Sequence, residues 1–399
     1  MISSSAAPVD APNLARFVSR RTENFVESVI REMSRLAMQH GAVNLAQGFP
    51  DFPAPADIKQ AALDSINQDL NQYPNTWGVK PFRDAIAAKY REHYGLELDP
   101  EREITGTCGS TEAMIATLLG ITNPGDEVVV FEPFYENYYP DTLLCQAERK
   151  LVTLYPPRWT FNPEELRRAF TSRTKAIILN TPHNPTGRVF SREELSVVAA
   201  LCQEFDCVAI SEEIYEHITY DGVRHTPIAT LPGMRERTII LNSMSKSYAV
   251  TGWRVGWTIA PPEITASIRK VHDFLTVGPP TPLQYAGAYA LSRPAEFYEM
   301  HRGDYEQKRN RLLGILAEAR LPGLAPQGAY YILANIAHLG RGRDVEFVKY
   351  MVEQVGVACV PGSSFFETKH LGADWVRFCF CKKDETLEQA RERLMAAKI

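Results

Sequence analysis

A series of short, almost wholly apolar runs between residues 104 and 260 constrains the fold more than any other feature of the sequence. The runs are Glu127–Phe131, Lys175–Leu179, Cys207–Ile210, Thr238–Leu241 and Val255–Ile259. Such runs are typical of strands that are buried on both faces of a parallel sheet. Segments with helical patterning separate several of them, for example residues 164–170 and 192–205. The sequence therefore predicts repeated strand–helix units and an α/β fold with a mostly parallel sheet flanked by helices.

The length of the chain and the pattern after residue 290 predict more than one domain. A chain of 399 residues exceeds a typical single domain. A long predicted helix over residues 293–320 is followed by a mixture of strands and helices near residues 330–334, 345–355 and 375–380. We expect a large α/β domain, a smaller C-terminal α+β domain and an N-terminal segment that packs with the small domain. Their expected bounds are residues 53–290, 291–399 and 1–52.

The composition disfavours several classes of function. The formal net charge is −5, so no nucleic-acid partner is expected. No run of about 18 apolar residues occurs, and the first ten residues lack the pattern of a secretory signal, so we expect neither a membrane span nor secretion. The seven scattered cysteines form no C-x-x-C pair, which favours the reduced cytoplasm. The histidines lack metal-site spacing, so we expect no structural metal.

Ligands of open parallel sheets bind beyond the carboxyl ends of the strands, so the polar residues there are candidates for chemistry. Lys246 follows the run 238–241 and is flanked by hydroxyls, and Arg254 lies eight residues further on in a Thr-Gly-Trp-Arg string. Arg254 and Ser243 can bind a phosphate dianion, and the added positive charge lowers the pKa of the lysine, as a Schiff-base lysine requires. A surface lysine in a serine-rich turn is the alternative, which S-x-x-K alone would favour.

Two further strand ends carry candidate residues. Asn184, in an Asn-Pro-Thr-Gly string, can donate its amide to a phenolate oxygen of a bound ring, although the string is also an excellent β-turn. Glu212 can pair with a protonated ring nitrogen, and Tyr215 can contact the same phenolic oxygen as Asn184. An acidic helix N-terminus is one alternative. A metal site is another, made from Glu212, Glu213, Glu216 and His217.

Three other positions have both a functional and a structural interpretation. The string from Gly109 through Ser110 and Thr111 can be an anion-binding helix N-terminus or a simple helix cap. Tyr135 can stack on an aromatic cofactor ring or pack in the core. Arg377 lies between apolar residues on a predicted strand, where it can bind a substrate carboxylate or form a structural ion pair.

Together these residues resemble the class I/II aminotransferases, which are fold-type-I pyridoxal-phosphate enzymes. The resemblance covers most of the chain and follows the order of the family's motifs. These are Y-x-x-x-x-G at Tyr73–Gly78, then G-S-T-E-A, N-x-x-x-N-P-T-G, E-I-Y, S-x-S-K, T-G-W-R-x-G and a late arginine. The strings LAQGFPDF and RFCF are most similar to the branch that contains kynurenine, glutamine and methionine aminotransferases.

The resemblance implies a pyridoxal 5′-phosphate cofactor bound to Lys246, which would also act as general acid and base. It implies that Asn184 and Tyr215 contact the cofactor O3′ and that Tyr135 stacks on the ring. The implied phosphate ligands are Gly109, Ser110, Thr111, Ser243 and Arg254, with Tyr73 from the other subunit of a homodimer. Ser245 is a further implied cofactor-binding residue. The implied ligands of the substrate carboxylate are Arg377, Asn184 and Gly48.

One departure from the family pattern concerns the partner of the pyridine nitrogen. The family usually has aspartate where this chain has Glu212. Glutamate keeps the charge but adds a methylene, so the ring or its strand must shift slightly or a water must mediate. We still assign this role to Glu212.

The resemblance implies ping-pong transfer of the α-amino group of an aromatic amino acid, methionine, glutamine or a similar donor to a 2-oxo acid. A β-eliminating C–S lyase on the same fold is the alternative, because it would use the same lysine. The sequence places no second arginine opposite the side-chain pocket, so an enzyme restricted to dicarboxylates is not indicated. Phe17, Trp77 and Tyr138 could line an apolar pocket or pack in the core.

Overall fold

A seven-stranded sheet in the order β2-β8-β7-β6-β5-β3-β4 forms the centre of the larger part of the protein. The computed structural model describes residues 14–397 except residues 24, 26, 341 and 342. The strands are β2 (Ile104–Thr107), β3 (Glu127–Glu132), β4 (Glu148–Thr153), β5 (Thr174–Asn180), β6 (Val208–Glu212), β7 (Thr238–Ser243) and β8 (Gly256–Ile259). They include all of the predicted apolar runs to within two residues, and the α/β fold is confirmed.

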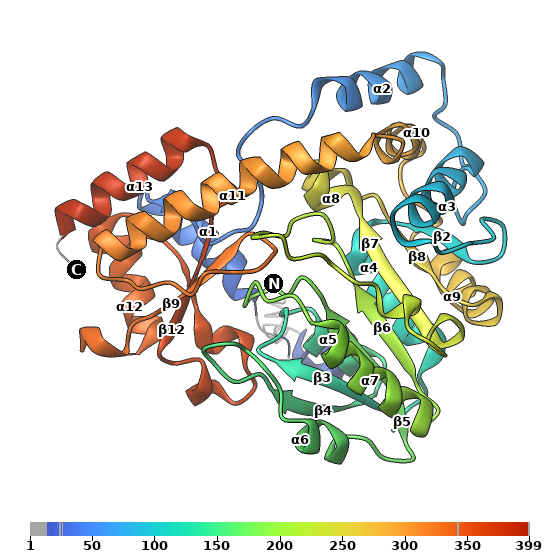
Figure 1. The fold of residues 1–399 in the computed structure, drawn as a ribbon, viewed down its shortest axis with the longest axis horizontal. Helices are drawn as coiled ribbons and strands as arrows, with labels where there is room; N and C mark the ends of the chain where they lie inside the picture. The colour runs from blue at the N-terminus through green and yellow to red at the C-terminus, as the bar shows by residue number, and fades with distance from the viewer. Residues whose placement is uncertain (1–13, 24, 26, 341–342, 398–399) are drawn as a thin grey trace, which may run out of the picture.

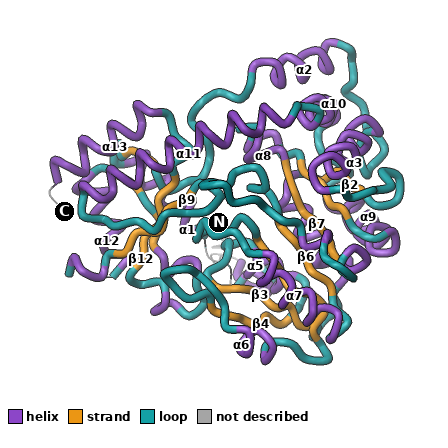
Figure 2. The backbone as a smooth tube through the Cα atoms, viewed as in Figure 1, coloured by secondary structure: helices purple, strands orange, loops and turns teal. Residues whose placement is uncertain are grey.

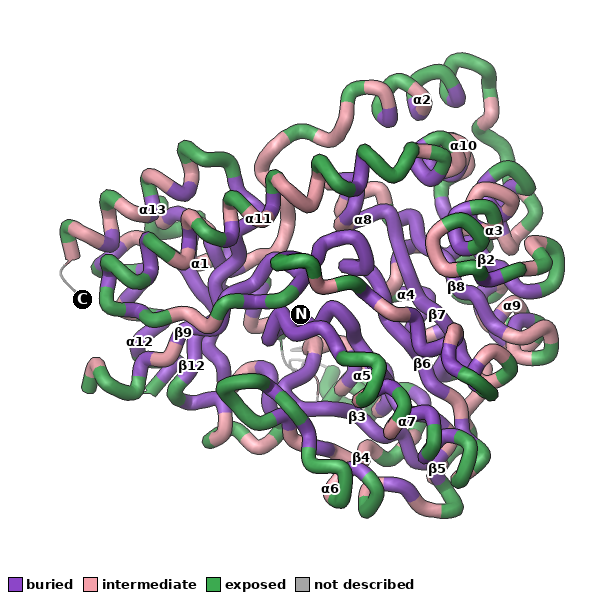
Figure 3. Tube along the Cα trace, in the orientation of Figure 1, coloured by how far each residue is buried: buried purple, intermediate pink, exposed green. Residues whose placement is uncertain are grey.

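The central strands are buried on both faces because alternate residues enter different hydrophobic cores. In β3, Val129 and Phe131 belong to one core cluster, whereas Val128 and Val130 belong to another on the opposite face. Side chains alternate between the faces of a strand, so an unbroken apolar run covers both. Figure 3 shows these strands as a continuous buried layer beneath helices with exposed outer faces.

Helices cover both faces of this sheet and one of its edges (Figures 1 and 2). α4 packs against α9, and α10 packs against α2 and α3. The helices of this part are α2 (Ala56–Asn67), α3 (Lys80–Tyr94), α4 (Gly109–Ile121), α5 (Tyr138–Leu144), α6 (Pro163–Arg168), α7 (Arg192–Glu204), α8 (Met244–Ser247), α9 (Pro262–Leu275) and α10 (Thr281–Leu291).

The C-terminal part is built on a three-stranded antiparallel sheet in the order β11-β12-β9. A second small sheet pairs β1, close to the N-terminus, with β10 in parallel. The strands are β1 (Val43–Asn44), β9 (Tyr331–Asn335), β10 (Val357–Ala358), β11 (Val360–Pro361) and β12 (Trp375–Cys379). The helices are α1 (Val29–Gln39), α11 (Ala295–Glu318), α12 (Asp344–Tyr350) and α13 (Asp384–Ala397). In Figure 1, α11 runs from α10 beside the large sheet to α13.

Two local expectations from the sequence differ from the structure. β8 pairs antiparallel with both β2 and β7, although its apolar composition is the same as that of the parallel strands. The apolar composition of a strand predicts its burial but not whether it pairs parallel or antiparallel with its neighbours. The helix predicted near residues 345–355 is α only as far as Tyr350, and a π-helical turn then continues it over Met351–Val355. No helix in the described part of the chain has the length and apolar character needed to span a bilayer.

We propose the division expected from the sequence, residues 1–52, 53–290 and 291–399, as the domain organisation. The large sheet lies within residues 104–259, and the β9–β12 sheet lies after residue 330. The pairing of β1 with β10 attaches the N-terminal segment to the later part of the chain. Residues 1–13 of that segment lie outside the described residues.

Candidate active site

One cavity of about 160 Å³ brings together polar side chains from strand ends that are far apart in the sequence. It lies beyond the carboxyl ends of β5, β6 and β7, and α1 and β12 contribute to its wall. Eleven of its lining residues were predicted from the sequence, namely Gly48, Ser110, Thr111, Tyr135, Asn184, Glu212, Tyr215, Ser245, Lys246, Arg254 and Arg377.

Lys246 lies on the short helix α8, which β7 places at the edge of the sheet. Its Nζ donates to the carbonyl of Gly48 at 3.2 Å. Loss of solvation lowers the pKa of this amine to about 8, and the charges of Arg254 and Arg377 act in the same direction. Glu212 acts in the opposite direction. An amine with a lowered pKa is more often unprotonated at neutral pH and is therefore a better nucleophile.

The N-terminus of α4 and the guanidinium of Arg254 form a cationic wall. Arg254 donates to Thr111 Oγ1 and to the carbonyl of Cys108, both at 3.4 Å. Gly109 begins α4 at φ +78°, and a Cβ at this position would lie 2.4 Å from the Arg254 guanidinium. Glycine is therefore needed for the close approach. The free N–H groups of a helix N-terminus and a guanidinium together favour a phosphate.

Arg377 is fully buried on β12 and has no carboxylate partner among the described residues. Its Nη1 donates to Asn184 Oδ1 at 2.7 Å, and its Nη2 donates to the carbonyl of Ala46 at 2.9 Å. The guanidinium lies 4.1 Å from the centre of the Tyr331 ring, and its Nε has no hydrogen-bond partner in the described structure. The alternative of a structural ion pair is therefore wrong. A buried cation without an anion is well suited to bind a ligand carboxylate.

Glu212 ends β6 and is buried against α5. The hydroxyl of Tyr138 donates to Glu212 Oε2, and Asn180 Nδ2 lies 3.5 Å from the same oxygen. Burial raises the pKa of Glu212, although hydrogen bonds from Tyr138 and Ser110 act in the opposite direction. From the sequence, Tyr138 could line a pocket or pack in the core. In the structure it is the residue that orients the Glu212 carboxylate.

Tyr215, Asn184 and Tyr135 lie around the middle of the cavity. The hydroxyl of Tyr215 is 3.0 Å from that of Tyr331, and burial raises the pKa of Tyr215 well above its usual value. Asn184 uses its Oδ1 for Arg377, which leaves its Nδ2 to donate to a ligand. Tyr135 lines the cavity and meets Tyr138 edge to face, with ring centres 6.0 Å apart. The cavity can therefore hold a flat ring with a polar group on its rim.

Three expected phosphate ligands, Gly109, Ser243 and Tyr73, do not line this cavity. Ser243 is buried, and its hydroxyl accepts the N–H of Ser245, so it caps α8. Tyr73 is 87% exposed and lies outside the cavity of its own chain. Gly48 has a packing role as well, since a Cβ there would lie 2.1 Å from the hydroxyl oxygen of Tyr331.

Sequence reasoning missed several lining residues, among them Ser28, Arg31, Gln47, Glu136, Asn180 and Tyr331. Asn180 could have been found, because it directly follows a predicted strand. Arg31 could not, because it belongs to an amphipathic helix with other charged residues on its surface. Phe17 is 68% exposed, and neither it nor Trp77 lines the cavity.

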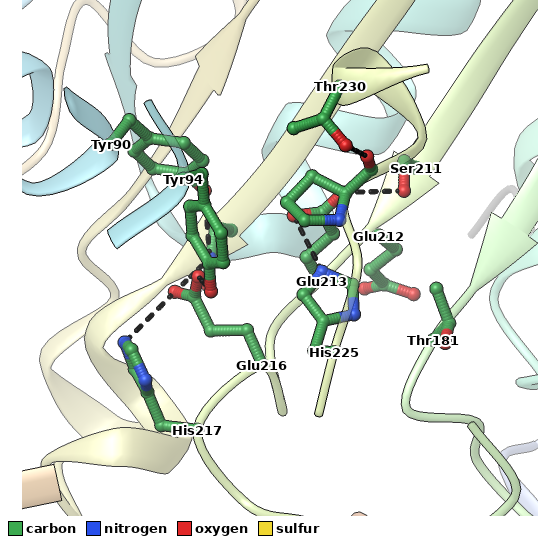
Figure 4. A network of polar contacts seen from close by, with 12 residues as sticks. Tyr90, Tyr94, Thr181, Ser211, Glu212, Glu213, Glu216, His217, His225 and Thr230 are labelled. Atoms are coloured by element: carbon green, nitrogen blue, oxygen red, sulfur yellow. Dashed lines mark hydrogen bonds and ion pairs between the residues drawn. The ribbon is translucent and has the colours of Figure 1, made fainter. Parts of the chain in front are cut away.

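A network of buried polar side chains surrounds Glu216, which follows Tyr215 in the chain (Figure 4). Glu216 accepts from Lys89, from the Tyr94 hydroxyl at 2.6 Å and from Asn242 Nδ2 at 2.6 Å. Burial alone would raise the pKa of Glu216, but Lys89, His217 and the Tyr94 hydroxyl lower it to about 2. Asn242 also accepts the N–H of Ser243. The network therefore joins the residues that follow β6 to the segment that carries Lys246.

The same network argues against the metal site considered from the sequence. Glu213 accepts from Ser211 and lies 3.0 Å from His225 Nε2, so its surroundings differ from those of Glu212 and Glu216. Within the described residues, no group of three or more potential metal ligands is present.

Comparisons with known proteins were made on both sequence and structure. The family model for aminotransferase class I and II matches residues 40–394. A probable N-succinyldiaminopimelate aminotransferase of Mycobacterium tuberculosis is 41% identical over 384 residues, which cover 94% of this chain and 97% of the relative. Human kynurenine–oxoglutarate transaminase 1 is 36% identical, with coverage of 92% and 95%. An Escherichia coli structure with a methionine aminotransferase function superposes with a TM-score of 0.91 at 36% identity, with coverage of 95% and 99%.

The buried Lys89–Glu216 pair should make a large contribution to stability. Lys89→Met leaves the Glu216 carboxylate buried without its cation, which should lower the free energy of unfolding by about 3–5 kcal/mol. Lys80→Met on the same helix removes an exposed pair with Asp84 and should cost less than about 1 kcal/mol. Urea unfolding of the two variants measures both values. Equal effects would show that burial of the pair does not matter.

The Lys246 amine should titrate near pH 8 in the cofactor-free protein. Only the unprotonated amine reacts with fluorodinitrobenzene, so its labelling rate should rise about tenfold per pH unit below pH 8 and level off above it. Peptide mapping at each pH isolates the rate of this residue, with Nα-acetyl-lysine as the reference amine. A Lys246 profile identical to that of the reference would contradict the lowered pKa.

Proposed function

The chain belongs to the class I and II aminotransferases, whose cofactor is pyridoxal 5′-phosphate, and we propose that this cofactor binds to Lys246. The observation that carries this proposal is the content of one cavity. It holds a lysine with a lowered pKa, a buried carboxylate and two arginines, Arg254 and Arg377, that have no carboxylate partner among the described residues. Each group has a counterpart in the cofactor or in an amino-acid substrate.

The residues present fit the cofactor. Its phosphate would lie at the N-terminus of α4, where Gly109 leaves room and where Ser110, Thr111, Ser245 and Arg254 line the cavity. Its ring nitrogen would face Glu212, whose raised pKa a cationic partner would lower. Asn184 Nδ2 and the Tyr215 hydroxyl would donate to O3′, and Tyr135 would stack on the ring. Ser243 would support the phosphate site through its cap on α8.

The protein's own side chains would bind the substrate and move its proton. The bound cofactor supplies the electron sink that makes the Cα–H bond of an amino acid acidic. Arg377 would hold the α-carboxylate, next to Asn184 and the carbonyl of Gly48. Lys246 Nζ would then take the proton from Cα and give it to C4′ of the bound cofactor, as general base and then general acid. Its lowered pKa suits both roles near neutral pH.

We infer that the amino donor is an aromatic amino acid, methionine, glutamine or a similar residue, and that the acceptor is a 2-oxo acid. The names of the relatives support this range, since they include kynurenine, methionine and N-succinyldiaminopimelate aminotransferases. The same relatives support transamination over the β-eliminating lyase, because none of them is named as a lyase.

We also propose a cytoplasmic homodimer in which each site receives Tyr73 from the partner. Tyr73 is 87% exposed, and Thr281 Oγ1 at the start of α10 donates to the carbonyl of Gln72, which joins the loop of Tyr73 to α10. Phe274, near the end of α9, is 93% exposed. A cluster of exposed apolar residues favours an interface.

The proposed cytoplasmic location rests on the cysteines. The free state of all seven is consistent with a reducing compartment.

A single half-reaction tests the proposed activity. Methionine or phenylalanine added to the holoenzyme should convert the cofactor to its amine form with release of the 2-oxo acid, and no ammonia should appear. Release of ammonia with pyruvate from a cysteine conjugate as the main reaction would favour the lyase instead.

Lys246→Ala should show no turnover, and borohydride reduction should attach no cofactor to it, because the variant lacks the amine. Turnover by that variant would contradict the assignment.

Subunit complementation tests the shared site. Lys246→Ala and Tyr73→Ala homodimers should each be impaired. Isolated mixed dimers should regain about half of the wild-type activity, because each of them has one intact site out of two. Co-expression with two different affinity tags isolates the hybrids for assay. Hybrids no more active than the parents would argue that Tyr73 acts within its own subunit or not at all.

A further inference from the structure

We propose that Arg31 on α1 determines how well the enzyme accepts substrates with a second carboxylate. The inference rests on the proposed function, since it assigns the side-chain end of the same substrate site. Arg31 lines the cavity that holds Lys246 and Arg377, although the sequence placed no second arginine there. The class of ligand that Arg31 would recognise is an amino acid or 2-oxo acid with an acidic side chain.

The charges in the cavity leave Arg31 available for such a ligand. Arg254 would be neutralised by the cofactor phosphate, and Arg377 by the α-carboxylate of the substrate. The Arg31 side chain forms no ion pair and no hydrogen bond with any described residue, and its backbone N–H is bonded to Ser28 Oγ. A guanidinium without a partner at the wall of a substrate cavity is well suited to a carboxylate, which it can bind through two parallel hydrogen bonds.

The acidic groups around Arg31 are already occupied by other partners. Glu27 pairs with Arg35, one turn further along α1. Glu136 accepts a hydrogen bond from Ser28 and forms no ion pair with Arg31, although both line the cavity. The nearest carboxylates thus partly offset the charge of Arg31 but do not bind it.

The position of Arg31 also explains how uncharged side chains could share the site. Ser28, Arg31 and Glu136 line a second, larger cavity of about 520 Å³ as well as the first. The second cavity has aromatic walls, which include Phe25, Phe134, Tyr139 and Phe366. A long apolar side chain would pass Arg31 into this space, whereas a short acidic one would stop at the guanidinium. Arg31 therefore adds acidic substrates to the range and excludes none of the apolar ones.

Arg31→Gln tests the proposal on the holoenzyme. We expect the ratio of kcat/KM for 2-oxoglutarate to kcat/KM for phenylpyruvate to fall about two- to fivefold, as expected for one partly solvated ion pair. The change should lie in the KM for 2-oxoglutarate and not in its kcat, because Arg31 is remote from the proton transfer. The dissociation constant of unreactive glutarate, measured by calorimetry, should rise by the same factor, and that of pentanoate should not.

Two variants with matched charges sharpen the test. Arg158→Gln removes an exposed guanidinium that lines neither cavity and should leave the substrate ratio unchanged. Glu136→Gln removes the opposing charge and should lower the KM for 2-oxoglutarate or leave it as it is. An unchanged ratio in Arg31→Gln, or an equal loss with both acceptors, would overturn this inference alone. Failure of the wild-type enzyme to transaminate any pair would overturn the proposed function with it.

Discussion

The arrangement of the site depends on polar groups that are withdrawn from water at the carboxyl edge of one sheet. A buried amine, carboxylate or guanidinium is tolerated only when its neighbours satisfy it. Glu216 is satisfied by Lys89, Tyr94 and Asn242, and this fixes the segments that follow β6 and β7 relative to each other. Because Tyr215 and Lys246 lie on those segments, a structural network also sets the positions of two reactive groups. Arg377, whose Nε has no partner among the described residues, lines the cavity, where a ligand can complete it.

Glu212 shows how the chain accommodates a departure from the family pattern. Its longer side chain is held by the phenol of Tyr138 from α5 and lies near Asn180 on the neighbouring strand. The added methylene is therefore taken up by contacts within the protein, and the carboxylate still lines the cavity. Its burial raises its pKa, which a cationic ring nitrogen would reverse.

The parts that the sequence predicted are those governed by local pattern. Apolar runs gave the strands, and the residues directly after them, such as Asn184 and Lys246, reached the cavity because strand ends converge. The parts that it missed depend on contacts between distant segments. The antiparallel direction of β8 follows from its connection to β7 and not from its composition. Tyr138 and Tyr331 are typical core aromatics until the fold brings them against Glu212 and Tyr215. Arg31 lies on an amphipathic helix that carries other charged residues, and nothing in the sequence distinguishes it from them.

The rigid placement of Arg377 has a stereochemical consequence. Its guanidinium is fixed by Asn184 and Ala46 and lies against the rings of Tyr331 and Phe365, so it has little freedom to follow a ligand. In the proposed substrate pose, a carboxylate anchored there, an amino group directed to the cofactor and a side chain directed past α1 would define three points around one tetrahedral carbon. Only one of two mirror-image amino acids would then meet all three while its hydrogen faces Lys246. Discrimination between enantiomers would thus follow from this immobile cation and from the two directions measured from it.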